Sequence, residues 1–160
     1  MNNEMRSAVV SYCNIGVGNE MSSKTSLQYP LHPRLRSIYD MLLKHFERII
    51  INEHQLLQVE KHRNKFLDYL PDKTVRDKVQ AEWGRSKLEG KDMWKVWNEH
   101  YNSWITANKD KMGGYRKNDL LLSREALVFT YLYPRLDANV STGINHLLKS
   151  PWCVHPKTGK

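Results

Sequence analysis

Apolar residues recur along most of the chain at the three- and four-residue spacing that is typical of amphipathic helices. The pattern predicts a short helix over residues 3–13 and then a loop over 16–33, which is rich in Gly, Pro, Ser and Thr. Further helices are expected over 34–51, 53–70, 72–86, 90–108 and 123–133. Ser123 is the expected N-cap of the last helix, and Glu125 falls in its first turn. Up to this point the sequence predicts an α-helical region.

A different pattern follows over residues 133–141, where polar and apolar residues alternate with period two. Arg135, Asp137 and Asn139 share one face of the predicted strand, and its other face is apolar. Taken alone, the pattern is explained by a sheet with one wetted face. The alternative is that Asp137 supplies an oxygen ligand to a divalent cation, since Mg²⁺ takes one or two protein carboxylates together with substrate phosphate oxygens.

The residues after this strand are basic. A short helix over 141–150 carries Lys149 at its C-terminus, where a cation complements the helix dipole whether or not it has another role. The tail that follows adds His155, Lys157 and Lys160. A carboxylate close to such cations is the combination that metal-assisted phosphoryl transfer requires, because the metal neutralises the reacting phosphate while Lys and His hold the leaving pyrophosphate.

Four aromatic residues share one side of the predicted helix over 90–108, namely Trp94, Trp97, Tyr101 and Trp104. Exposed aromatic rings can stack on the bases of single-stranded nucleic acid. An aromatic stripe at helical spacing more often belongs to a protein core, and we interpret this one as core.

The other candidate binding groups have ordinary explanations. Histidines at 45, 54, 62 and 100 lack a common ligand spacing, so we expect surface positions and no metal site from them. The basic cluster at 61–63 and 65 could contact a phosphate backbone, but a solvated helix face is the preferred interpretation.

Composition and charge narrow the class of protein. Apolar residues make up 40% of the chain and charged residues 26%, which is typical of a globular protein. No stretch is apolar enough to span a membrane, and the first residues do not form a signal peptide. Cys13 and Cys153 lie far apart, which indicates a reducing compartment, either cytosol or nucleus. The net charge of +8 favours polyanionic partners such as nucleic acid or nucleoside triphosphates.

Residues 133–159 read YPRLDANVSTGINHLLKSPWCVHPKTG. This stretch closely resembles the third-aspartate block of the eukaryotic-type DNA primase small (catalytic) subunit, a member of the archaeo-eukaryotic primase family. The upstream helices, from His-Pro at 32–33 to Leu-Pro at 70–71, resemble the helical insertion that precedes this block in the same family.

The resemblance implies that the chain is mainly α, with a short C-terminal β/α piece of the mixed α/β primase catalytic core. Residues 1–132 would be the helical insertion and residues 133–160 part of that core. It also implies primer synthesis on single-stranded DNA by metal-dependent nucleotidyl transfer.

The resemblance further implies roles for particular residues. Asp137 matches the third aspartate that binds Mg²⁺ or Mn²⁺, and Lys149 and His155 match residues that contact the nucleoside triphosphate. Arg135, on the same strand face as Asp137, is a possible supporting residue. The partners that the resemblance implies are the primase large subunit, the DNA polymerase alpha complex, the DNA template and nucleoside triphosphates, and the compartment is the nucleus.

Three features of the family are absent from the 160 residues. There is no Asp-x-Asp pair, no Ser-Gly-Arg-Arg-Gly-x-His motif, and no clustered Cys/His set for the family's structural Zn²⁺. We therefore expect a fragment of a primase small subunit that is inactive by itself. The alternative is a non-catalytic basic helical module that binds nucleic acid or a primase partner.

Overall fold

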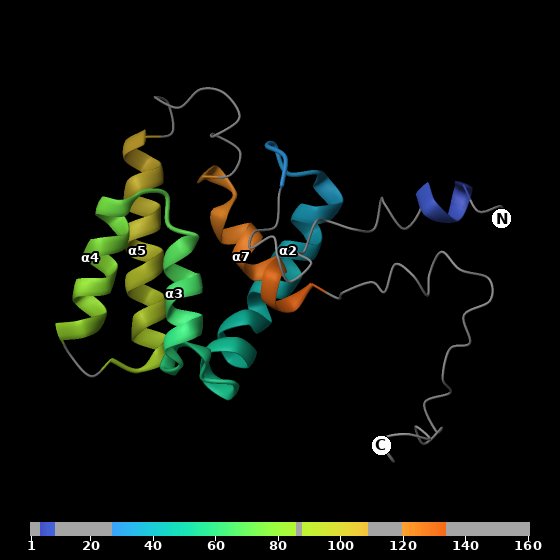
Figure 1. Cartoon of the computed structure of the whole chain (residues 1–160). Helices are drawn as coiled ribbons and strands as arrows, with labels where there is room; N and C mark the ends of the chain where they lie inside the picture. Colours follow the sequence, from blue (N-terminus) through green and yellow to red (C-terminus); the bar gives the residue numbers. More distant parts are fainter. Residues whose placement is uncertain (1–3, 9–26, 86–87, 109–119, 134–160) are drawn as a thin grey trace, which may run out of the picture. The chain divides into compact units, whose positions relative to one another are not determined.

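The computed structural model describes residues 4–8, 27–85, 88–108 and 120–133 (Figure 1). The chain divides into two compact units, one formed by Met1–Ile15 with Pro134–Lys160 and the other by Gly16–Tyr133. In the first unit only residues 4–8 are described, and they are helical. The expected division into a helical region over 1–132 and a catalytic-core piece over 133–160 stays a prediction.

The second unit begins with a long helical segment. Helix α2 spans Pro33–Phe46 and continues into a π-helical segment, η1, over Glu47–Glu53. Pro33 suits the first turn because its fixed φ is already helical, and the His32 side chain accepts a hydrogen bond from the Arg34 amide at 3.3 Å. The helix expected over 34–51 is thus present and extends slightly further.

The helix expected over 53–70 is wrong in its first part. Gln55 has a φ of 48°, in the left-handed region, and this conformation interrupts the helical path. A 3-10 turn, η2, follows over Leu56–Gln58, and helix α3 covers only Glu60–Asp68. The spacing of apolar residues continues past Gln55, so the sequence pattern does not predict this break in the helix.

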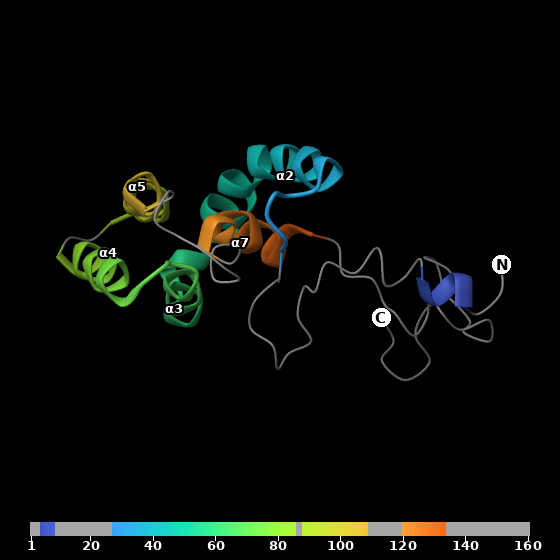
Figure 2. The same ribbon diagram turned by 90° about the horizontal axis from the view of Figure 1, so that it is seen from above.

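The next two helices match the sequence pattern closely. Helix α4 spans Lys73–Arg85 and helix α5 spans Gly90–Asn108, and the two pack along each other (Figures 1 and 2). Asp72 links them, because one of its carboxylate oxygens accepts from the Val75 amide at 2.8 Å and the other from the Trp104 indole at 2.7 Å. One side chain therefore caps α4 and ties it to α5.

The core contains the aromatic stripe of α5. Trp97 is fully buried between Trp94 and Tyr101, with a ring separation of 5.2 Å on each side. Its indole N–H donates to the Phe66 carbonyl at 2.9 Å. Trp94, Trp97 and Tyr101 are all buried, which confirms the core interpretation for them, while Trp104 is half-buried.

Helix α7 spans Ser123–Leu132 and packs along α2 (Figures 1 and 2). The expected N-cap, Ser123, is wrong, because the capping position is Leu122 and no side chain caps the helix there. Leu122 is buried, so packing rather than capping preference sets where this helix begins. Glu125 does lie in the first turn, as expected.

The described residues are mostly helical and contain no strand, which confirms a mainly α chain. The expected C-terminal β/α piece lies outside the described residues. None of the helices in the described ranges has the length and apolar character needed to cross a bilayer.

Candidate active-site segment and the helix that leads to it

The residues with expected chemical roles lie just beyond the described part of the chain. Asp137, Arg135, Lys149 and His155 are all outside it. The last described residue, Tyr133, directly follows α7 and is four residues before Asp137. Among the described residues, those of α7 and Tyr133 therefore lie closest to Asp137 in the sequence.

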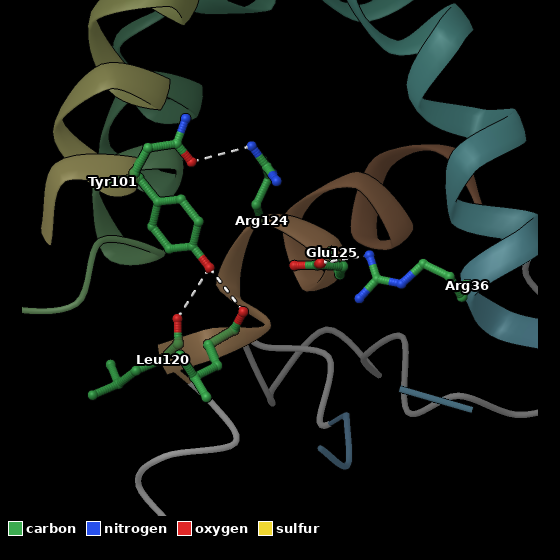
Figure 3. Close-up of polar contacts among 7 residues, drawn as sticks. Arg36, Tyr101, Leu120, Arg124 and Glu125 are labelled. Atoms are coloured by element: carbon green, nitrogen blue, oxygen red, sulfur yellow. Dashed lines mark hydrogen bonds and ion pairs between the residues drawn. The ribbon is translucent and has the colours of Figure 1, made fainter. Parts of the chain in front are cut away.

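The chain entering α7 is held by α5. The Tyr101 hydroxyl lies 3.1 Å from the Leu120 carbonyl oxygen and 3.0 Å from that of Leu121 (Figure 3). Burial, as the largest cause, raises the pKa of Tyr101, so the group remains a hydroxyl donor near neutral pH. Arg124 lies over the Tyr101 ring at 5.8 Å, and its guanidinium approaches the Asn102 amide oxygen at 3.4 Å.

The first turn of α7 is joined to α2 by an ion pair. The Arg36 guanidinium donates to the Glu125 carboxylate at 2.9 Å (Figure 3). The Glu125 side chain is only 7% exposed, whereas that of Arg36 is 42% exposed. The carboxylate also lies at the helix end whose dipole favours negative charge. Glu125 is therefore a buried charge that depends on Arg36 for its compensation.

Arg36→Met should lower the free energy of unfolding by about 2 kcal/mol, because it leaves the Glu125 carboxylate buried without its partner. This value is below that of a fully buried pair, since Arg36 is partly exposed. Glu125→Gln should cost less, because Arg36 can then turn to solvent. Urea denaturation of the three proteins measures both effects.

The control for this prediction is Arg48→Met. Arg48 pairs with Glu53 at the same 2.9 Å, but both side chains are exposed, so the substitution should leave stability nearly unchanged. If Arg36→Met and Arg48→Met lowered the free energy of unfolding equally, the burial of Glu125 would not make its ion pair more important for stability than the exposed pair.

The end of α7 is held by α3. The His62 imidazole Nδ1 lies 3.0 Å from the Tyr131 hydroxyl, and the Tyr69 hydroxyl lies 2.7 Å from the Thr130 hydroxyl. Burial raises the pKa of Tyr131. Burial, together with Lys61 and Lys65, lowers the pKa of His62. Both shifts favour the neutral form of each group near pH 7.

These contacts refine the expectations for the histidines. His45 and His54 are exposed, as expected, whereas His62 and His100 are half-buried and hydrogen-bonded. Within the described ranges, no three His, Cys, Asp or Glu side chains gather closely enough to hold a metal ion.

The basic cluster on α3 is only partly a solvated face. Lys61 is exposed. Arg63 lies 3.3 Å from the Gln58 carbonyl oxygen, and the Lys65 ammonium lies 5.4 Å from the centre of the Tyr131 ring. Arg63 and Lys65 therefore contact other residues of this chain and are not simply exposed to solvent.

The comparisons with known proteins give the same family as the resemblance of residues 133–159. The sequence profile of the DNA primase small subunit family matches residues 1–160. The DNA primase small subunit of Schizosaccharomyces pombe is 29% identical over 164 residues, which cover 100% of this chain and 35% of that protein.

Two further relatives have the same description. The DNA primase small subunit of Drosophila melanogaster is 30% identical over 155 residues, covering 95% of this chain and 34% of the relative. That of Caenorhabditis elegans is 31% identical over 180 residues, covering 99% and 40%. The chain thus spans between 34% and 40% of the length of these three relatives. Because the profile covers all 160 residues, the chain belongs to the DNA primase small subunit family.

Proposed function

We propose that this chain contributes the third metal-binding carboxylate, Asp137, to an enzyme that makes short RNA primers on single-stranded DNA by metal-dependent nucleotidyl transfer. The family match over the whole chain, which includes the 133–159 block, is the observation that carries the proposal. The relatives are named as primase small subunits, which fits the same activity.

The donor chemistry of the block fits a hard divalent cation. Asp137 offers carboxylate oxygens, and Arg135 and Asn139 share its face of the expected strand. Asp137 would hold Mg²⁺ or Mn²⁺, and the bound metal would stabilise the negative charge of the reacting phosphate. Among the described residues, no group of three His, Cys, Asp or Glu side chains could hold a metal ion.

Lys149 and His155 are proposed to hold the nucleoside triphosphate. In a complete small subunit that carries this sequence, Lys149→Ala and His155→Ala should each raise the nucleotide KM about tenfold, because each removes one charge-assisted contact to phosphate. Steady-state primer synthesis at varied nucleotide concentration measures this. Lys157→Ala is the matched control from the same basic tail, and equal KM values for all four proteins would contradict the assignment.

Activity is proposed to need carboxylates that these 160 residues do not supply, since no Asp-x-Asp pair occurs in them. A primer-synthesis assay on the 160-residue chain alone should therefore give no product above background. Robust RNA synthesis by this chain would overturn the requirement. The proposed partners are the primase large subunit and the DNA polymerase alpha complex, and the proposed compartment is the nucleus.

A second candidate function is a non-catalytic basic module that binds nucleic acid or a primase partner. The net charge of +8 favours it. Trp94, Trp97 and Tyr101 of α5 are buried, so the faces of these three rings are not available for base stacking, and binding would depend mainly on phosphate contacts. Single-stranded DNA binding that weakens steeply with salt would support this function, and weak binding with a shallow salt dependence would exclude it.

A further inference from the structure

We propose that a pocket between α3, α4 and the start of α5 binds a short, uncharged peptide segment of a partner protein, which inserts one large apolar side chain. The pocket has a volume of about 450 Å³, and all the residues that line it belong to the Gly16–Tyr133 unit. Its three helices lie side by side (Figures 1 and 2). The inference goes beyond the proposed function, because it does not depend on the role of Asp137.

The floor of the pocket is apolar and held in place by the core. It contains Leu67 of α3, Trp83 of α4 and Met93 of α5, and all three side chains are buried. The Trp83 indole N–H donates to the Met93 carbonyl at 3.0 Å, which joins α4 to α5 beneath the pocket. Ligand pockets in proteins have volumes of about 300–1,000 Å³ and mostly apolar walls. The floor therefore suits an apolar side chain, which would leave water on entering.

The rim of the pocket carries three carboxamide side chains. Gln58 at the end of η2, Asn64 of α3 and Gln80 of α4 all line the pocket and are exposed. A carboxamide offers N–H donors and a carbonyl acceptor, which are the two kinds of group that a peptide backbone also presents. The rim can therefore satisfy the N–H and C=O groups of a peptide whose side chain fills the pocket, and such groups need partners when they are buried.

The charge of the pocket argues against nucleic acid as the occupant. Its described lining contains one acidic residue, Glu60, one basic residue, Arg63, and no lysine. The Arg63 Nη1 already lies 3.3 Å from the Gln58 carbonyl oxygen and 3.5 Å from that of Leu57. Nucleic acid is held by clustered cations and by exposed aromatic rings, whereas Trp83 is buried. A lining whose two formal charges cancel favours an uncharged peptide.

Gly84 leaves space in one wall of the pocket. It lies in α4, so its backbone is helical, and it lines the pocket. A Cβ atom built on Gly84 would meet no heavy atom of the described residues within 4 Å. Neither the backbone conformation nor the packing of these residues therefore requires glycine, which is also a poor helix former. The missing side chain keeps the pocket open and gives a direct way to close it.

The experiment uses a complete small subunit that carries this sequence. Random heptapeptides displayed on phage are selected on the parent protein, and synthetic copies of the enriched peptides are titrated by fluorescence anisotropy. The enriched peptides should share one large apolar residue among uncharged residues. Gly84→Leu should weaken their binding at least about tenfold, because the new side chain occupies the pocket. Gln80→Ala should weaken it about three- to tenfold, because it removes one hydrogen bond.

The controls separate closure of the pocket from loss of structure. The melting temperature of Gly84→Leu should equal or exceed that of the parent, since leucine is the better helix former. Ala81→Leu is the matched control, because Ala81 is exposed on α4 and does not line this pocket, so peptide affinity should be unchanged. Asp137→Asn should also bind the peptides like the parent, which makes the test independent of the proposed metal role.

Three results would overturn the inference. The parent could enrich no peptide, Gly84→Leu could bind every enriched peptide like the parent, or Ala81→Leu could lose as much affinity as Gly84→Leu. A fluorescent single-stranded oligothymidylate tests the other class of occupant. The parent and Gly84→Leu should bind it equally, because the pocket is not expected to hold nucleic acid. If Gly84→Leu bound it at least about tenfold more weakly, the pocket would be a nucleic-acid site and the peptide proposal would be wrong.

Discussion

Asp137→Asn, in a complete primase small subunit that carries this sequence, is expected to lower nucleotide addition about a thousandfold or more. The substitution keeps the shape of the side chain but removes its negative charge, which a hard divalent cation requires. Metal stabilisation of the reacting phosphate contributes several kcal/mol, and each 1.36 kcal/mol corresponds to about a factor of ten in rate. Single-turnover primer extension with saturating nucleotide measures the chemical step.

The matched control is Asp92→Asn. Asp92 lies exposed in the first turn of α5, so the same chemical change there should leave nucleotide addition within about twofold of the parent rate. The melting temperature of Asp137→Asn should stay close to that of the parent, which excludes unfolding as the cause. Near-normal turnover by Asp137→Asn would remove Asp137 from the metal site.

The second large effect is expected at Trp97. Trp97→Ala should lower the free energy of unfolding by about 3–5 kcal/mol, because it removes a fully buried indole from between Trp94 and Tyr101. It also removes the hydrogen bond to the Phe66 carbonyl, which ties α5 to α3. A loss of this size is a large part of the stability of a typical domain. Urea denaturation followed by circular dichroism measures it.

Trp97→Phe separates the two contributions of this residue. It keeps an aromatic ring in the stack and removes the indole N–H, so its loss should be smaller than that of Trp97→Ala. Met41→Ala is the control, because Met41 is exposed on α2 and should tolerate truncation. If Trp97→Ala were as stable as Met41→Ala, the aromatic stripe of α5 would not be part of the core. Stacking of its rings on the bases of nucleic acid would then again be a candidate role.

The helical part of the chain could be predicted from apolar spacing because most of its helices bury one face. The expected helix over 90–108 agrees with α5 at both ends, since Trp94, Trp97 and Tyr101 repeat at the spacing of a single buried stripe. The spacing failed where the backbone departs from regular geometry. The left-handed Gln55 breaks an expected helix while the apolar pattern continues.

The anchoring of α7 could not be predicted, because its contacts join residues that are distant in the sequence. Arg36 and Glu125 are 89 positions apart, and His62 and Tyr131 are 69 apart. Each residue alone has an ordinary explanation as a surface charge, a surface histidine or a core aromatic ring. Only the packing of α2, α3 and α5 around α7 brings them together. Ser123 failed as an N-cap for a related reason, since the burial of Leu122 sets the start of α7.

The prediction of the site began from residues 133–141, in which polar and apolar residues alternate. Period-two alternation places Asp137 with Arg135 and Asn139, but it does not distinguish a metal ligand from a wetted strand face. The resemblance of residues 133–159 to the third-aspartate block supplied the distinction. The family match over the whole chain supports that resemblance, and the roles of Asp137, Lys149 and His155 stay predictions.

The most direct test of the metal role is Mn²⁺ binding to the complete small subunit, measured by electron paramagnetic resonance without nucleotide or template. If Asp137 is a metal ligand, Asp137→Asn should weaken the tightest Mn²⁺ site at least about tenfold, since one of its few carboxylates is lost. Asp92→Asn should leave that site unchanged. Equal Mn²⁺ affinity in the parent and in Asp137→Asn would contradict the account.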